Sequence, residues 1–252
     1  MIEVKNVYKS FDGNLVLKNI SSRFEPGKTN LIIGRSGSGK TVLLKSILGL
    51  FDIDRGEIWY DDRNFVETTE NDRKKMRREI GMVFQGGALF DSLTVEANVR
   101  FPLDMFTSQS YEEKKKRVDF CLEHVNIEQS AQKLFPSEIS GGMQKRVAIA
   151  RAIALNPRYL FCDEPNSGLD PETATIIDKL IQNLTREFNM TTIINTHDMN
   201  SVIEIGESVL FITKGEVGWE GTNKEILHTE NDKLNEFIFA NKLYAQMRKE
   251  NK

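Results

Sequence analysis

The chain has 252 residues, of which 39% are hydrophobic and 28% charged, which is typical of a folded globular protein with one large domain rather than two full ones. Its formal net charge of −3 lacks the basic excess of a nucleic-acid-binding surface, so no nucleic-acid partner is expected. Cys121 and Cys162 are too few for a disulfide framework, and no run approaches the roughly 18 consecutive apolar residues of a membrane span.

The first part of the chain predicts strands and helices in alternation. Apolar and polar residues alternate in MIEVKNVYKSF and in VLKNISSRFE, and the turn at Asp12, Gly13 and Asn14 predicts a β-hairpin. An apolar strand over Thr29–Ile33 leads into a glycine-rich loop, and the spacing of VLLKSILGL predicts a helix that ends at Gly49. A strand over residues 56–60, a charged helix over residues 73–79 and the strand IGMVFQ follow.

The rest of the chain predicts a helical insertion within a parallel α/β sheet. Residues 95–155 are mainly helical in pattern, with breaks expected near Pro102 and over residues 136–142. The strand RYLFCD, a helix over residues 171–188 and the strand TTIINTH restore the alternation. The tail from about residue 230 predicts an amphipathic helix that packs on its own domain, with a second subunit or an accessory protein as alternatives. Its apolar side chains are Leu234, Phe237, Ile238, Tyr244 and Met247.

Residues 34–41, GRSGSGKT, match the P-loop pattern between a predicted strand and a predicted helix. Backbone N–H groups of such a loop surround a polyphosphate, Lys40 supplies a positive charge to the β and γ phosphates, and the Thr41 hydroxyl can bind Mg²⁺. A glycine-rich turn with a chance lysine is the alternative, and the context argues against it. The candidate phosphate-binding residues are Gly34, Arg35, Ser36, Gly37, Ser38, Gly39, Lys40 and Thr41.

Three further patterns are candidates for a ligand site. Asp163 and Glu164 end the strand RYLFCD, where one acid can hold Mg²⁺ and the other can act as a general base, although such pairs also occur as helix-start residues. ISGGMQ precedes the helical pattern KRVAIARAIAL and is either a second phosphate-binding helix start or a serine N-cap, which those residues alone favour. A lone histidine after a strand is usually structural, but His197 stands between Thr196 and Asp198 directly after TTIIN.

The order of GRSGSGKT, Gln85, ISGGMQ, FCDE, SGLD and His197 is similar to that of ABC-transporter nucleotide-binding domains. The resemblance covers about residues 1–228. It implies an α/β fold with a P-loop NTPase (RecA-like) core, an antiparallel β subdomain and a helical subdomain inserted at about residues 88–156. Residues 229–252 would then form a C-terminal helical extension. The implied activity is ATP hydrolysis, with ATP and Mg²⁺ as cofactors.

The same resemblance implies a role for each motif residue. ATP would stack on Phe11 and be held by residues 34–41, with Mg²⁺ bound by Thr41, Gln85 and Asp163. The signature residues Ser140, Gly141 and Gly142 would reach the γ phosphate held by a second copy of the chain, so that two ATP molecules lie between two subunits. Glu164 would be the catalytic base, His197 would contact the γ phosphate, and Asp170 would belong to the loop that links the two sites.

Three departures from the family pattern are visible. The signature reads ISGGM instead of LSGGQ, Asn166 stands where threonine is usual, and Phe11 replaces the frequent tyrosine. None of them removes a phosphate or metal contact.

The segment GALFDSLTV followed by NVRFPL looks like the ATPases of Mla-type phospholipid transporters. That resemblance implies two ATPase copies on the cytoplasmic face of the cell membrane, an integral membrane permease, and an MCE-domain protein that carries lipid. Importers for amino acids and other solutes share a similar region and remain the alternative. A non-transport ABC ATPase would carry tandem ATP domains or a long coiled-coil insertion, and a small-molecule kinase would lack ISGGMQ and the Asp163–Glu164 pair.

Overall fold

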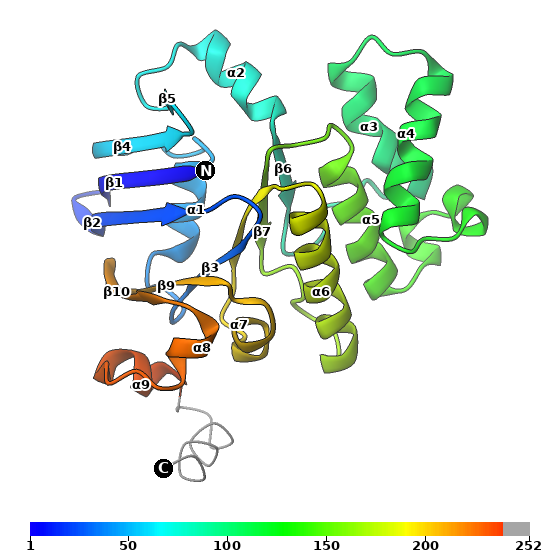
Figure 1. Ribbon diagram of the computed structural model, residues 1–252. Coiled ribbons are helices and arrows are strands. Elements are labelled where there is room, and N and C mark those ends of the chain that lie inside the picture. Colours follow the sequence, from blue (N-terminus) through cyan, green and yellow to red (C-terminus); the bar gives the residue numbers. More distant parts are fainter. Residues whose placement is uncertain (239–252) are drawn as a thin grey trace.

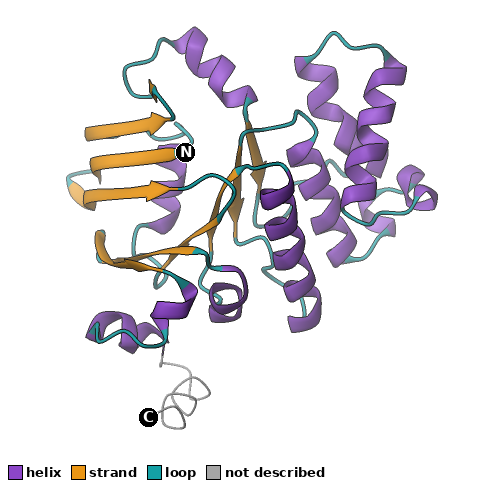
Figure 2. Ribbon diagram, in the orientation of Figure 1, coloured by secondary structure: helices purple, strands orange, loops and turns teal. Residues whose placement is uncertain are grey.

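The computed structural model describes residues 1–238, which form two β-sheets and a set of helices (Figures 1 and 2). The small sheet lies on one side of the larger one. Helices α3 (Val95–Phe106), α4 (Tyr111–His124) and α5 (Gly141–Ile153) gather on the other side (Figure 1). Within residues 1–238, none of the helices has the length and apolar character needed to cross a membrane.

The small sheet is antiparallel and begins with the predicted hairpin. Its strand order is β2-β1-β4-β5. At the hairpin turn, Asp12 and Gly13 have φ angles of 48° and 79°, and a type I′ turn requires positive φ at both central residues. Its strands are β1 (Ile2–Phe11), β2 (Asn14–Phe24), β4 (Arg55–Tyr60) and β5 (Arg63–Asn64).

The larger sheet has the order β10-β9-β3-β8-β7-β6. Strands β9, β3, β8, β7 and β6 are parallel, and β10 pairs antiparallel with β9. The parallel α/β core expected from the sequence is therefore confirmed. The sequence interpretation had assigned no element to the β9–β10 hairpin. The strands are β3 (Thr29–Ile33), β6 (Ile80–Val83), β7 (Tyr159–Asp163), β8 (Thr191–Asn195), β9 (Ser208–Thr213) and β10 (Glu216–Gly221).

The helices fall into two groups. One group connects strands of the two sheets or follows the last strand. The connecting helices are α1 (Lys40–Ile47), α2 (Glu70–Arg78), α6 (Pro171–Glu187) and α7 (Met199–Ile205), whereas α8 (Asn223–Ile226) and α9 (Asp232–Ile238) follow β10. The other lies between β6 and β7 in the chain. It comprises α3 (Val95–Phe106), α4 (Tyr111–His124), the 3₁₀ turns η1 (Gln129–Lys133) and η2 (Pro136–Glu138), and α5 (Gly141–Ile153).

Pro102 lies inside α3, so the helix break predicted near it is wrong. Proline removes one backbone hydrogen bond and costs roughly 3 kcal/mol in a helix interior. The helix continues because Val95, Val99 and Leu103 are buried in one core cluster, and tertiary packing of one face can outweigh the local penalty. The second predicted break is present, since η2 and the N-cap Ser140 separate α4 from α5.

The large sheet is covered on both faces. On β3, Leu31 and Ile33 pack into the cluster built from α3 to α7, whereas Ile32 packs against α1 and the small sheet. Alternate side chains of a strand point to opposite faces, so both faces are apolar and β3 is buried along its whole length. This leaves the carboxyl ends of the parallel strands as the edge at which polar side chains collect.

Helix α9 packs on its own chain. Leu234 and Ile238 are fully buried in the same cluster as the large sheet, and Phe237 stacks against Phe211 of β9 with ring centroids 5.4 Å apart. Tyr244 and Met247, the other two apolar residues of the predicted tail helix, lie outside the described residues.

Replacing Leu234 should therefore destabilise the protein. Leu234→Ala removes a fully buried side chain and should lower the free energy of unfolding by about 2–5 kcal/mol. Urea unfolding of the isolated chain measures this, with Lys233→Ala, at an exposed neighbouring position, as the control. An unchanged midpoint for Leu234→Ala would mean that α9 does not pack on the core in solution.

Candidate nucleotide-binding and catalytic site

A cavity of about 750 Å³ lies at the carboxyl ends of the parallel strands. Residues far apart in the sequence meet there because the loops after β3, β6, β7 and β8 reach the same edge of the sheet. The lining residues are Val16, Arg35, Ser36, Gly37, Gly39, Lys40, Thr41, Val42, Gln85, Glu164, His197 and Phe237. Most of the predicted P-loop therefore shares one cavity with Gln85, Glu164 and His197.

The P-loop connects β3 to α1. Gly39 precedes α1 with φ of 110° and provides no side-chain cap, so the first backbone N–H groups of the helix are available to an anion. Lys40 is 7% exposed, and its Nζ donates to the carbonyls of Gly34 at 2.9 Å and Arg35 at 3.2 Å. Burial lowers the pKa of Lys40, while the nearby carboxylates of Glu164 and Asp163 oppose that shift.

Glu164 forms the centre of a polar cluster beside the P-loop. Its Oε1 lies 2.8 Å from Nδ1 of His197, and its Oε2 accepts a hydrogen bond of 3.3 Å from Nε2 of Gln85. The same Gln85 nitrogen lies 3.3 Å from the hydroxyl of Ser167. Glu164 also has a φ of 47°, a backbone conformation that is unfavourable for a residue with a side chain and recurs at functional sites. The cluster brings together three residues that the sequence singled out separately.

Asp163 and Thr41 are joined by a residue that the sequence interpretation missed. The Nδ2 of Asn195 donates to Asp163 Oδ1 at 2.6 Å and to Thr41 Oγ1 at 3.3 Å. Asn195 is the last residue of the buried strand β8. A polar residue at the carboxyl end of a buried strand, two positions before His197, was the signal that could have identified it.

The predicted signature residues and the loop residue Asp170 form a second cluster, which does not line the cavity. Ser140 is the N-cap of α5, and its hydroxyl accepts a hydrogen bond of 3.3 Å from the backbone N–H of Met143. The N-cap predicted from the sequence is therefore present. A Cβ on Gly142 would lie 2.8 Å from Cγ2 of Thr173, and Thr173 is the residue whose N–H caps onto Asp170 at 3.0 Å. Ser140, Gly141, Gly142 and Asp170 do not line the cavity of their own chain. Figure 1 shows α5 and α1 on opposite sides of the large sheet.

Phe11 lies at the end of β1 and is 37% exposed. Its ring meets the edge of Phe51 at 5.1 Å, and the ammonium of Lys9 lies 5.0 Å from the ring centroid. Phe11 does not line the P-loop cavity. Val16, Val42 and Phe237 do line it, although the sequence interpretation assigned none of them to the site.

The buried side chain of Asn166 connects the loop after Glu164 to helices α6 and α7. The amide nitrogen of Asn166 donates to both carboxylate oxygens of Asp178 at 3.2 and 3.4 Å and to Ser201 Oγ at 2.8 Å. Burial raises the pKa of Asp178 to about 6 and the charges of Asp198 and Glu204 add to it, whereas hydrogen bonds from Ser201 and Asn166 oppose it.

The carboxyl group of Asp178 should make the protein less stable as the pH rises. Its folded pKa of about 6 lies above the unfolded value of 3.8, so its stabilising contribution is complete below pH 3.8 and is lost as the pH passes 6. Two pKa units correspond to roughly 3 kcal/mol. Asp178→Asn should therefore show a smaller loss of unfolding free energy between pH 5 and pH 7.5 than the parent in urea titrations. The exposed Asp91→Asn should keep the parental loss, and an equal loss in Asp178→Asn would contradict the assignment.

Comparison with known proteins gives the family. The ABC transporter family profile matches residues 17–167. The chain is 38% identical over 239 residues to the methionine import ATP-binding protein MetN of Clostridium tetani, covering 94% of this chain and 74% of that protein. It is 35% identical over 238 residues to the intermembrane phospholipid transport system ATP-binding protein MlaF of Haemophilus influenzae, covering 94% of this chain and 90% of that protein.

A solved structure agrees with the sequence relatives. The dimeric, post-hydrolysis structure of the ATP-binding cassette MJ0796 bound to ADP and Pi is similar to this fold with a TM-score of 0.79 and 35% identity, covering 88% of this chain and 99% of that one. Together with the P-loop cavity and the Glu164 cluster, these matches show that the chain belongs to the ABC transporter family, as an ATP-binding subunit that hydrolyses ATP.

Proposed function

We propose that two copies of this ATPase hold two Mg-ATP molecules between them and drive a separate membrane permease that moves phospholipid. The observation that carries the pairing is the division of the site. The P-loop cavity contains Lys40, Gln85 and Glu164 but none of the signature residues, which lie with Asp170 in a second cluster. Because Ser140, Gly141 and Gly142 do not line the cavity of their own chain, a second copy would supply them to the γ phosphate.

The Glu164 cluster supports a hydrolytic mechanism. A water that attacks the γ phosphorus must lose a proton as the bond to the ADP oxygen breaks, and a carboxylate within hydrogen-bond reach can accept that proton. The contacts from His197 and Gln85 hold the two oxygens of Glu164 at 2.8 and 3.3 Å and so fix its orientation. In this proposal His197 contacts the γ phosphate, Asp170 links the two sites, and Phe11 stacks on the adenine.

The residues present fit a magnesium nucleotide. Mg²⁺ prefers oxygen ligands and takes several of them from phosphates and water, and Thr41, Asp163 and Gln85 offer a hydroxyl, a carboxylate and an amide oxygen. The buried Ser38 hydroxyl of the P-loop has no hydrogen-bond partner among residues 1–238, as expected of a group that binds phosphate. Bound Mg²⁺ would neutralise charge on the phosphate oxygens, while Lys40 and the loop N–H groups orient them.

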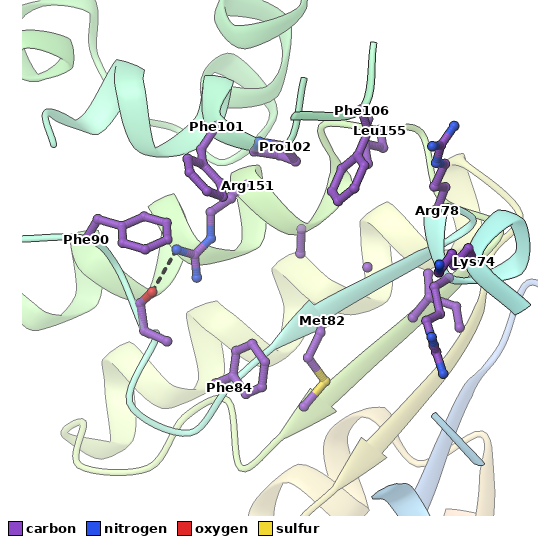
Figure 3. A pocket seen from close by; sticks show the side chains of 15 residues that line it. Lys74, Arg78, Met82, Phe84, Phe90, Phe101, Pro102, Phe106, Arg151 and Leu155 are labelled. Carbon is purple, nitrogen blue, oxygen red and sulfur yellow. Dashed lines mark hydrogen bonds between the residues drawn. The ribbon is translucent and has the colours of Figure 1, made fainter. Parts of the chain in front are cut away.

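An apolar groove beside Gln85 supports contact with a permease. It has a volume of about 680 Å³ and is lined by aromatic side chains of the β6 loop and α3, including Phe84, Phe90, Phe101 and Phe106 (Figure 3). Phe84, Phe90 and Phe106 are each more than 40% exposed, and Lys74, Arg77 and Arg78 of α2 add positive charge to the same groove. Such a groove fits a helix with an apolar face and acidic flanking residues.

The loop after β6 contacts both the nucleotide cavity and the groove. Gln85 lines the cavity, whereas Phe84 and Ala88 line the groove. Arg151 of α5 holds this loop through hydrogen bonds of 2.7 Å to the carbonyls of Gly87 and Ala88. Closure of the pair on ATP would shift this loop and so change the permease contacts, and hydrolysis would reset them.

The proposed cargo follows from where the Mla-like segment lies. Ala88, Phe90, Phe101 and Pro102 belong to that segment and line the groove. Similarity at a permease-binding surface bears on the partner more directly than similarity in a phosphate loop does. The identity to MlaF supports the same conclusion. An MCE-domain lipid carrier is then the expected further partner, and the ATPase pair would lie on the cytoplasmic face of the cell membrane.

Import of methionine or another small solute is the second candidate. The identity of 38% to a methionine importer subunit favours it. In either case residues 1–228 would form the nucleotide-binding domain, with the helical insertion at about residues 88–156, and residues 229–252 the C-terminal extension.

Reconstitution separates the two candidates. The ATPase and the permease encoded beside it are placed in liposomes, and ATP-dependent movement of labelled phospholipid is compared with that of methionine, other amino acids and sugars. Phospholipid movement that disappears with Glu164→Gln would support the proposal. Solute transport without lipid movement would overturn the cargo and leave the ABC ATPase.

Docking in the groove has its own test. Phe106→Asp should abolish co-purification of the permease and leave the ATPase rate of the isolated chain unchanged. Phe135→Asp is the matched control, because Phe135 is 40% exposed and lies outside the groove. Retention of the permease by Phe106→Asp would contradict docking at this surface.

A further inference from the structure

Asn195 is a buried amide beside the proposed magnesium site. It is 1% exposed and ends β8, with Asp163 of β7 on one side and Ile32 of β3 on the other. Its backbone carbonyl accepts a hydrogen bond of 2.8 Å from the N–H of Glu164. The backbone of Asn195 therefore already contacts both candidate acids, since it pairs with Asp163 and accepts a hydrogen bond from Glu164.

The side chain of Asn195 makes two further contacts with the site. Its Nδ2 donates to Asp163 Oδ1 at 2.6 Å and to Thr41 Oγ1 at 3.3 Å. An ionised carboxylate can only accept hydrogen bonds, so the contact with Asp163 determines which end of the amide faces it. One nitrogen thus joins two of the groups that would hold Mg²⁺, from two different elements of the fold.

The other end of the amide is unsatisfied. Within residues 1–238, Oδ1 of Asn195 is one of the few buried side-chain atoms without a hydrogen-bond partner. Buried polar atoms are nearly always paired, and an exception points to a missing ion, water or ligand. Mg²⁺ keeps several of its waters when it binds, and such a water can donate to this oxygen.

We propose that Asn195 is a positioning residue for the magnesium ion, an inference that rests on the proposed Mg-ATP site. Its Nδ2 orients the Asp163 carboxylate and the Thr41 hydroxyl, and its Oδ1 accepts a hydrogen bond from water bound to the cation. Groups that orient metal ligands commonly change metal affinity when they are removed. Asn195 should therefore set how much Mg²⁺ the protein needs to bind ATP.

Thermal unfolding with ATP tests this without a measurement of activity. In the Glu164→Gln background, which should keep ATP intact, the melting temperature is followed at fixed ATP as Mg²⁺ is titrated. Asn195→Leu, of similar size but without the amide, should raise the half-saturating Mg²⁺ concentration about 10- to 100-fold. ATP without metal should stabilise this variant as much as it stabilises the Glu164→Gln parent. If Asn195→Leu does not fold, the small polar Asn195→Ser gives the same comparison.

Thr192→Val is the matched control, because Thr192 is a buried polar residue of the same strand whose hydroxyl contacts Thr185 at 2.6 Å. It should shift the melting temperature without changing the Mg²⁺ requirement. An unchanged Mg²⁺ requirement in the Asn195 variants would overturn the inference and leave the ATPase function intact. A parent that Mg-ATP does not stabilise would instead contradict the proposed nucleotide site itself.

Discussion

Glu164→Gln should slow ATP hydrolysis by about 10²- to 10⁴-fold, the usual contribution of a general base, while ATP binding stays close to that of the parent. The amide keeps the size of the carboxylate but cannot accept the proton of the attacking water. The contact of 2.8 Å between Oε1 and Nδ1 of His197 positions this group beside the P-loop. Phosphate release and ATP affinity, measured on the same preparation, separate the two effects.

The chain contains a matched control for this variant. Glu187 Oε1 lies 3.2 Å from Nε2 of His124, a glutamate–histidine pair that does not line the cavity. Glu187→Gln should hydrolyse ATP at the parental rate. If Glu164→Gln also hydrolysed ATP at that rate, the assignment of the base would be wrong.

Lys40→Ala should weaken ATP binding itself, in contrast to Glu164→Gln. A charge-assisted hydrogen bond to phosphate contributes about 1.5–3 kcal/mol, which corresponds to a rise in the dissociation constant of roughly 10- to 100-fold. Lys40 is nearly buried and already lies against the loop carbonyls of Gly34 and Arg35, so its charge is fixed where the β and γ phosphates would bind. Hydrolysis should fall as well, because the phosphates are no longer oriented.

Fluorescent-nucleotide titration measures this affinity, and Lys75→Ala controls for the loss of a lysine, since Lys75 is exposed on α2 and outside the cavity. Its affinity should equal that of the parent. An unchanged affinity in Lys40→Ala would mean that the phosphates bind elsewhere.

Local signals were sufficient for much of the fold. The Asp12–Gly13 turn, the apolar strand Thr29–Ile33 and the helix after the P-loop all follow from residue spacing and turn chemistry within a few positions. The β9–β10 hairpin was not recognised because its turn places Lys214 at a φ of 51°, and lysine is not a residue that signals such a turn. The break at Pro102 was wrongly predicted because the helix is retained by tertiary packing rather than by local propensity.

The candidate site could likewise be predicted only in part from local sequence. The P-loop could be recognised from one continuous segment, whereas the residues around Glu164 are separated by up to 112 positions in the chain, from Gln85 to His197. Only the order of the family motifs linked them before the fold was known. Asn195 and Phe237 were missed because their relevance depends on neighbours in space: Asp163 for the first, and Phe211 and the cavity for the second.

The most direct test of a site shared by two copies is the mass of the protein in solution. With Mg-ATP, the Glu164→Gln variant should double its mass by light scattering, and without nucleotide it should remain a monomer. Adding Ser140→Arg should prevent the doubling and leave nucleotide binding intact, because Ser140 lies outside the cavity of its own chain. A monomer that hydrolyses ATP at a rate independent of protein concentration and of Ser140 would contradict the account.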